Sequence, residues 1–308
     1  MQTILYITGS GRSGSTILDI LLGEGDNTFS IGEFKQFWKK FLKKGALCSC
    51  NKNYLNCNFW SEIIKEIFGK YEISEKEIDY FCSLQKIVER IPLINFFQTK
   101  KYILNYKKEI EEYKNFLLEI YGKIFKNTGA SIIIDSSKLP HYLFLLKDIP
   151  YEIKIIHLIR DPRGVAYSWT KLKFDPSVNE YMKRYHPFTS VRKWIYINFV
   201  IEILKKDFKY FTRLKYEDFC CSPQTNLNKV LKELNLLIHG LPNLSNKKFI
   251  IKKLKHLVGG NPNRFNDKEI FIHLDYQWVK EFSTKNKILV SLLCLPMLLK
   301  YKYSILNR

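Results

Sequence analysis

The sequence predicts a three-layer α/β fold with a central, mainly parallel sheet flanked by helices. Three runs rich in β-branched residues, 3–7, 131–135 and 154–159, have the length of buried strands, and each is followed by a polar loop and an apolar helical segment. A further strand is predicted at 210–216, after a long amphipathic helix. Parallel sheets bind their ligands at the carboxyl ends of the strands. The loops that follow the strands are therefore the expected site.

The loop after the first strand has the composition of a phosphate cradle. Residues 8–16 read TGSGRSGST and precede a helix predicted at 17–22. Gly9, Gly11 and Gly14 let the backbone turn tightly and bring its N–H groups close to an anion. The helix adds its unpaired N-terminal donors and the positive end of its dipole. The predicted fold is therefore P-loop-like.

The loop differs in one respect from the P-loop of nucleoside triphosphatases, GxxxxGK[ST]. Gly9, Gly14 and Thr16 keep its spacing, but Ser15 replaces the lysine, and Arg12 is the long cation of the loop. Triphosphatases place that lysine on the β- and γ-phosphates and the hydroxyl on Mg²⁺. The displaced cation favours a phosphate-bearing ligand other than a Mg²⁺-bound triphosphate. The alternative, a glycine-rich turn without a ligand, does not account for the hydroxyls and the arginine.

The whole chain, 1–308, is assigned to a single domain with a helical insertion at roughly 60–126. The insertion is predicted because apolar residues recur there at i, i+3 and i+4 without a glycine-rich interruption. No repeat and no second glycine-loop unit follows. Insertions in such folds usually shape the substrate side of the site.

Charge and hydropathy limit the partners. The net charge of +20, from 50 Lys+Arg against 30 Asp+Glu, favours anionic ligands, but the lysines are scattered and no DNA-reading module is recognisable. We therefore expect no nucleic-acid partner. The apolar start at 4–7 is too short for a secretory signal, and the longest apolar run, 288–299, contains Pro296 and is too short to span a bilayer. A cytoplasmic protein without a transmembrane segment is expected; a peripheral membrane contact by the last helix is the alternative.

Three cysteines lie close together in the sequence. Cys48 and Cys50 form a CxC pair, and Cys57 follows seven residues later. This spacing is compatible with a metal site that lacks one ligand, with a disulfide or with a structural loop. Because no fourth cysteine or histidine lies nearby in the sequence, no metal is assigned.

Two motifs together resemble the sulfotransferase family that uses 3′-phosphoadenosine 5′-phosphosulfate (PAPS). The first is GRSGST at 11–16, and the second is LIRDPRGVAYS at 158–168, each directly after a predicted strand. The resemblance extends to about Trp278. It implies PAPS as co-substrate, with the 3′-phosphate bound by Arg160 and Ser168. It assigns the 5′-phosphosulfate to the loop residues Gly11, Arg12, Ser13, Gly14, Ser15 and Thr16.

The same resemblance implies the catalytic residues. Arg12 and the loop N–H groups would stabilise the charge that develops on the leaving 5′-phosphate. Lys138 resembles the lysine that reaches the bridging oxygen in the tyrosylprotein branch of the family. Glu33, in an IGEF segment, resembles the base glutamate of that branch. Its neighbours Ile31 and Phe34 are apolar, which predicts a raised pKa for its carboxyl group. The alternative for Glu33 is an exposed loop carboxylate.

Other polar groups near these motifs are expected to have simpler roles. The cytosolic branch of the family uses a histidine as base, so His141 and His157 are alternatives to the glutamate. His157 lies within a buried strand and is expected to be a satisfied core residue. Arg163 is expected to pair with Asp161.

Two further assignments complete the implied cofactor site. Tyr216 resembles the family tyrosine near the adenine. Residues 259–264, GGNPNR, resemble the late loop that closes over the cofactor, with Asn261 in its backbone and Arg264 directed to the 3′-phosphate end.

The acceptor is the least determined part, because 60–126 shows no detailed match to the family. A small-molecule or glycan acceptor hydroxyl, on a carbohydrate, a lipid or another small molecule, is expected. Two alternatives stay open at this point: a P-loop nucleotide kinase and a non-catalytic protein that binds nucleotides or polyanions.

Overall fold

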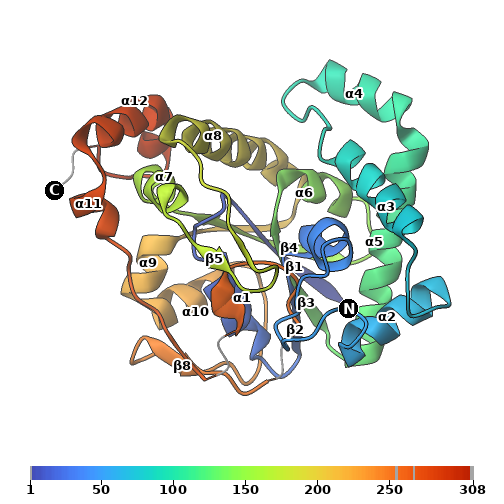
Figure 1. Cartoon of the computed structure of the whole chain (residues 1–308). Helices are drawn as coiled ribbons and strands as arrows, with labels where there is room; N and C mark the ends of the chain where they lie inside the picture. The colour runs from blue at the N-terminus through green and yellow to red at the C-terminus, as the bar shows by residue number, and fades with distance from the viewer. Residues whose placement is uncertain (1, 254–255, 266–267, 306–308) are drawn as a thin grey trace.

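The structure, a computed structural model, describes residues 2–253, 256–265 and 268–305 (Figure 1). Its centre is a five-stranded sheet of order β2-β3-β1-β4-β7 in which every neighbouring pair is parallel. These strands are β1 (Thr3–Thr8), β2 (Thr28–Gly32), β3 (Ile132–Lys138), β4 (Glu152–Ile159) and β7 (Tyr210–Lys215). The predicted α/β fold is confirmed, and β2 is an edge strand that the sequence pattern did not identify.

The remaining elements are helices and two short antiparallel pairs. The α-helices are α1 (Ser15–Gly23), α2 (Asn58–Phe68), α3 (Glu75–Val88), α4 (Phe96–Asn105), α5 (Lys107–Thr128), α6 (Pro140–Leu146), α7 (Pro162–Thr170), α8 (Pro187–Leu204), α9 (Tyr216–Cys221), α10 (Pro223–Glu233), α11 (Gln277–Glu281) and α12 (Thr284–Lys300). The other helical segments are the 3₁₀ helices η1 (Phe34–Gln36), η3 (Lys205–Asp207) and η4 (Pro262–Phe265) and the π-helix η2 (Phe37–Leu42). The small pairs are β5 (Phe174–Asp175) with β6 (Glu180–Tyr181), and β8 (Lys248–Ile250) with β9 (Glu269–Phe271).

Helices cover both faces of the sheet because alternate residues of a strand point to opposite sides and both sides are apolar. In β1, Ile4 and Tyr6 belong to one hydrophobic core, and Leu5 and Ile7 belong to the other. Side chains of α5, α6 and α8 contribute to the first core and those of α1, α9 and α10 to the second. The sheet thus forms the middle of three layers.

Four helices, α2 to α5, occupy the region of the predicted insertion (Figure 1). The longest of them, α5, buries a stripe at helical spacing that includes Ile110, Tyr113, Leu117 and Ile124. It ends where Gly129 adopts a left-handed backbone, as glycine commonly does after a helix. The assignment of the whole chain to one domain stays a prediction. Among the described residues, no helix has both the length and the apolar character that a membrane span requires.

The carboxyl ends of the three central strands are level with one another. Thr8 at the end of β1 pairs in register with Lys138 of β3 and with His157 of β4. The glycine loop after β1, the end of β3 and the segment that follows β4 therefore leave the sheet at the same edge. This edge holds the cavity described next.

Candidate active site

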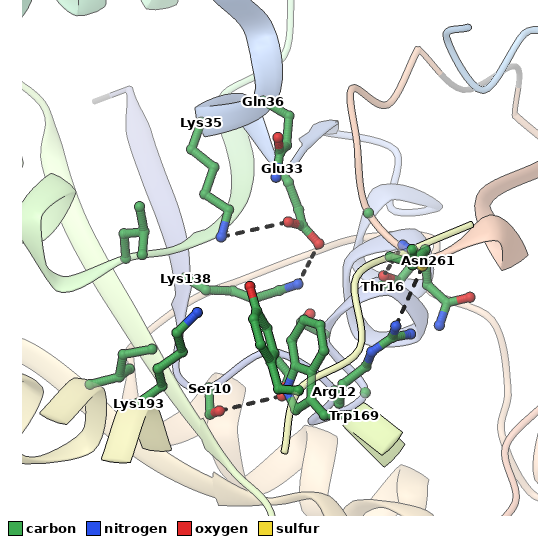
Figure 2. A pocket seen from close by; sticks show the side chains of 18 of the residues that line it. Ser10, Arg12, Thr16, Glu33, Lys35, Gln36, Lys138, Trp169, Lys193 and Asn261 are labelled. Atoms are coloured by element: carbon green, nitrogen blue, oxygen red, sulfur yellow. Dashed lines mark hydrogen bonds and ion pairs between the residues drawn. The ribbon is translucent and has the colours of Figure 1, made fainter. Parts of the chain in front are cut away.

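A cavity of about 490 Å³ opens at the carboxyl edge of the sheet (Figure 2). Its walls come from the glycine loop, the segment after β2, the connection from β3 to α6, and α8, together with the loop at 260–263. Five cationic side chains line it: Arg12, Lys35, Lys40, Lys138 and Lys193. Glu33 is the carboxylate among the described lining residues. Such an excess of positive charge in a concave site attracts an anionic ligand.

Arg12 lies at the centre of the glycine loop in a left-handed backbone conformation, with φ 69°. Its guanidinium carbon lies 4.7 Å from the centre of the Trp169 ring (Figure 2). Its Nη2 lies 3.4 Å from Met182 Sδ. Arg12 Nε and the hydroxyl of Ser13 are buried, and neither has a hydrogen-bond partner among the described residues. Buried donors without an acceptor are costly, so they indicate a place where an anion binds.

Gly14 is the N-cap of α1 and also has a left-handed backbone, with φ 86°. A Cβ atom at this position would lie 2.7 Å from the ring of Tyr216. A Cβ at Gly11 would lie 3.0 Å from the ring of Trp169. The loop therefore needs both glycines for its close contact with two aromatic rings, and the first residues of α1 line the cavity.

We expect Gly14→Ala to lower the free energy of unfolding by about 2–4 kcal/mol, because the new side chain adds left-handed strain and a ring clash. Gly69→Ala is the matched control: Gly69 has φ 70° but no atom within 4 Å of the Cβ position. It is expected to cost about 1–2 kcal/mol, the backbone strain alone. Urea denaturation of both variants measures the difference, and equal losses would contradict the ring contact.

Glu33 follows β2 and is held from both sides. Its backbone N–H donates to the carbonyl of Val258 at 2.7 Å. Two residues later, the backbone N–H of Lys35 donates to Ser137 Oγ at 2.9 Å. Its carboxylate forms an ion pair with Lys138 and lies 3.7 Å from the ammonium of Lys35 (Figure 2). The structure thus brings two of the predicted catalytic side chains into direct contact.

The predicted raised pKa of Glu33 is wrong. Burial does act to raise the pKa of this carboxyl group, but the charges of Lys138 and Lys35 outweigh burial and lower the pKa to about 2. The apolar neighbours that motivated the prediction, Ile31 and Phe34, are almost fully buried in the hydrophobic core. The carboxylate therefore faces cations, which sequence neighbours did not reveal.

Lys138 ends β3 with φ 71°, an uncommon backbone conformation for a residue with a side chain. Its carbonyl accepts hydrogen bonds from Thr8 Oγ1 at 2.8 Å and from the N–H of Gly9 at 3.3 Å. These bonds join the end of β3 to the start of the glycine loop. Arg12 and Lys138, the two predicted catalytic cations, therefore both have strained backbones at the cavity, a pattern that is common at functional sites.

Arg160 and Ser168 are not brought together by any contact among the described residues. Arg160 is buried behind the glycine loop: it donates to the carbonyl of Arg12 at 2.9 Å, pairs with Asp275 at 3.0 Å, and lies 4.4 Å from the Tyr216 ring centre. Ser168 is half-buried near the end of α7. Neither residue lines the cavity, so their role at a 3′-phosphate stays a prediction.

The remaining predicted cofactor residues lie around α1. Tyr216 packs its ring on Gly14, and its hydroxyl accepts from the N–H of Asp275 at 3.2 Å. Asn261 lines the cavity, and its N–H donates to Thr16 Oγ1 at 3.2 Å. Arg264 is fully buried and donates to the carbonyl of Gly260 at 2.9 Å, so it supports the loop from behind instead of facing the cavity.

Of two structural roles expected from the sequence, one is confirmed in part and one in full. His157 is fully buried and its Nε2 lies 2.7 Å from Asn198 Oδ1, but its buried Nδ1 has no hydrogen-bond partner among the described residues. Arg163 forms a two-bond ion pair with Asp161, at 2.9 Å and 2.6 Å. His141, the other candidate base, lines the cavity with Nε2 3.3 Å from the hydroxyl of Tyr196.

Several lining residues had no signal in the sequence. Lys35 and Lys40 lie close to Glu33 in the chain, but two more lysines carry no information in a sequence with 50 Lys+Arg. Trp169, Met182 and Lys193 reach the cavity from α7, from the segment before α8 and from α8. Only the packing of these segments over the glycine loop identifies them.

Comparisons with known proteins report on the family and the fold of the chain. Residues 5–239 match the sequence profile of the sulfotransferase family. A solved sulfotransferase domain from the curacin biosynthetic pathway is 14% identical, with 99% of each chain covered and a TM-score of 0.54. The sulfotransferase domain of the Synechococcus PCC 7002 olefin synthase is 18% identical, with a TM-score of 0.55. That alignment covers 98% of this chain and 95% of the olefin synthase domain. At these identities the two structures show a shared fold. No curated protein sequence matches the chain.

The family profile covers both motifs quoted above, β1 from its third residue on, and the strands β2, β3, β4 and β7. The family predicted from those motifs is therefore confirmed. The cavity, with its glycine loop, its five cations and its buried carboxylate, lies within the matched segment except for the loop at 260–263. The chain belongs to the sulfotransferase family and is a sulfotransferase enzyme.

Proposed function

We propose that the protein transfers the sulfuryl group of PAPS to a hydroxyl of a small acceptor, a carbohydrate, a lipid or another small molecule. The observation that carries this proposal is the juxtaposition in one cavity of Arg12, whose buried Nε has no acceptor among the described residues, with the ion pair of Glu33 and Lys138. Ser13, next to Arg12 in the glycine loop, has a second buried donor without an acceptor, its hydroxyl. The donors suit an anionic leaving group, and the carboxylate suits a proton acceptor.

The residues present fit PAPS, which supplies a transferable sulfuryl group and a 5′-phosphate leaving group. The amides of 11–16 and the guanidinium of Arg12 would hold the 5′ end. Arg160, Ser168, Tyr216 and Asn261 would hold the adenosine 3′-phosphate end, as the family resemblance implies. Arg160 already orders the loop through the carbonyl of Arg12.

Glu33 would accept the proton of the acceptor hydroxyl. A carboxylate with a pKa of about 2 is fully ionised at neutral pH, but it is a weak base. Its low pKa depends on Lys138, whose ammonium is also the group that the family resemblance assigns to the bridging oxygen. When an anion shares the charge of Lys138, the carboxylate loses part of its stabilisation and its basicity rises. We infer that donor binding strengthens the base in this way.

Binding of 3′-phosphoadenosine 5′-phosphate, the desulfated product, tests the cofactor part of the proposal. Isothermal titration calorimetry is expected to show saturable binding without Mg²⁺. Arg12→Ala is expected to weaken it about 10–100-fold, because hydrogen bonds to a charged group contribute about 1.5–3 kcal/mol. Arg192→Ala, which removes an exposed arginine of α8 that does not line the cavity, is the matched control.

Equal affinity of the parent and Arg12→Ala would contradict the assignment of the glycine loop. An ATP titration with and without Mg²⁺ in the same experiment decides the kinase alternative, since a kinase requires Mg²⁺-dependent ATP binding. Labelled PAPS with a panel of glycans, glycolipids, phenols and tyrosine peptides identifies the acceptor class.

We also propose a cytoplasmic location, which the seven free cysteines support, because thiols stay reduced in that compartment.

A further inference from the structure

The three clustered cysteines meet a histidine that is about two hundred residues away in the chain. The Sγ atoms of Cys48, Cys50 and Cys57 and a ring nitrogen of His256 all lie within 4.8 Å of one another. His256 lies outside residues 5–239, the segment that matches the family profile. The ligand missing from the sequence pattern is therefore supplied by the fold.

Three of the distances in this cluster are close to those of a tetrahedral site. His256 Nδ1 lies 3.2 Å from Cys57 Sγ and 3.9 Å from Cys48 Sγ, and Cys50 Sγ lies 3.6 Å from Cys57 Sγ. In a zinc site with Zn–S bonds of about 2.3 Å and a Zn–N bond of about 2.0 Å, ligand atoms lie about 3.5–3.8 Å apart. A disulfide would need two sulfur atoms about 2.05 Å apart, and all seven cysteines are free.

The cysteine segment is shaped by its own backbone. The N–H of Cys48 donates to the carbonyl of Lys52 at 2.8 Å, and the N–H of Asn51 donates to the carbonyl of Cys48 at 2.9 Å. Asn51 has φ 62°, a conformation that asparagine tolerates better than most residues. This tight turn presents Cys48 and Cys50 on one side, and Cys57 follows as the N-cap of α2.

The histidine segment is fixed against that turn by contacts that involve no metal. The N–H of Leu257 donates to Ser49 Oγ at 2.8 Å, and the N–H of Ser49 donates to the carbonyl of Leu257 at 3.2 Å. Trp60 Nε1 donates to the carbonyl of His256 at 2.8 Å, and the Phe59 ring stacks on the imidazole with centres 5.1 Å apart. The four ligands are thus preorganised.

We propose that Cys48, Cys50, Cys57 and His256 bind one zinc ion in a structural Cys₃His site. Thiolates with an imidazole in tetrahedral arrangement select zinc over harder cations. Four protein ligands leave no open position for water or substrate, so the ion has a structural role. Cys48 and Cys57 are fully buried, and Cys50 and His256 are half-buried.

The site joins the cysteine turn to the loop that borders the active-site cavity. Two residues after His256, Val258 accepts the backbone hydrogen bond of Glu33 and donates to the carbonyl of Ile31 at 2.9 Å. Gly260 and Asn261 then line the cavity. Zinc would therefore hold in place the loop that positions Glu33. The metal site itself does not depend on the proposed donor or acceptor.

Metal analysis of the tag-free full-length protein, purified without chelator, tests the proposal. Inductively coupled plasma mass spectrometry is expected to find about one zinc ion per chain. Cobalt replacement is expected to give the absorption of tetrahedral Co²⁺ with thiolate charge-transfer bands. Cys50→Ser and His256→Ala are expected to lose the ion, whereas His256→Cys keeps four ligands and retains it. Cys221→Ser, at an exposed cysteine outside the cluster, is the matched control.

If the Cys50 and His256 variants fail to fold, chemical modification of the thiols of the parent protein serves as the test in their place. Release of stoichiometric zinc on modification supports the proposed zinc site. A parent protein without stoichiometric metal overturns the proposal, as does metal that persists unchanged in folded Cys50→Ser and His256→Ala. A Cys50–Cys57 disulfide detected by mass spectrometry also overturns it. None of these readouts uses sulfuryl transfer, so they remain valid if the proposed function fails.

Discussion

Replacing Glu33 with glutamine is expected to lower kcat by about 10²–10⁴-fold, the usual contribution of a general base. The amide keeps the shape of the side chain but cannot accept the hydroxyl proton. Affinity for 3′-phosphoadenosine 5′-phosphate should change little, because the predicted contacts to the nucleotide come from the glycine loop, the residues after β4, Tyr216 and Asn261, and not from Glu33. Steady-state kinetics with labelled PAPS, together with calorimetric binding of the nucleotide, measures both quantities.

Glu72→Gln is the control for this experiment, since Glu72 is exposed and does not line the cavity. A Glu33→Gln enzyme with the parent kcat would show that the base is elsewhere. His141 is then the candidate, because it lines the cavity and burial lowers its pKa to about 4, which leaves the imidazole neutral at pH 7. His141→Ala would lose activity under that alternative and would keep most of it if Glu33 is the base.

Replacing Lys138 with methionine is expected to lower kcat by about 10²–10³-fold and to change the pH profile. The pKa of Glu33 is about 2 in the parent because the lysine charges outweigh burial. Protonation of Glu33 should therefore not limit kcat/KM above about pH 4. Without the Lys138 charge, burial raises the pKa of Glu33, so activity should fall on the acid side at a higher pH than in the parent.

The test is kcat/KM of the two proteins measured from acid to neutral pH, since this ratio reports ionisations of the free enzyme. Lys138→Arg keeps the positive charge, so kcat/KM should begin to fall on the acid side at the same low pH as in the parent. Lys193→Met removes a different cavity cation, one that lies 3.7 Å from the Tyr185 ring centre, and should leave the position of the limb unchanged. An identical profile for Lys138→Met and the parent would contradict the pairing of Lys138 with Glu33.

The central sheet could be predicted because its signals are local. A strand that is buried on both faces needs a run of apolar, β-branched residues, and 3–7, 131–135 and 154–159 have such runs. Edge strand β2 lacked this signal, because Ser30 and Gly32 interrupt its apolar pattern. This segment is a strand because it pairs with β3 in the folded sheet. The contact of Arg163 with Asp161 was predictable because the partners are two residues apart.

The electrostatics of the site could not be predicted in the same way. The sequence places Glu33 next to Ile31 and Phe34, and from these neighbours a raised pKa follows. In the structure the cation that matters most, Lys138, comes from a position 105 residues away. Coulomb energies depend on the distance between charges in space, which adjacency in the chain does not report.

The sequence by itself determined the parallel sheet, the glycine loop with its displaced cation and the family to which the chain belongs. Each of these depends on residues that are consecutive or a few positions apart. The tertiary structure alone decided that Glu33 is ionised beside Lys138, that Arg264 supports a loop from behind, and that His256 completes the cysteine cluster. The physical reason is that burial, ion pairing and ligand geometry are set by the distances between segments, and only folding establishes those distances.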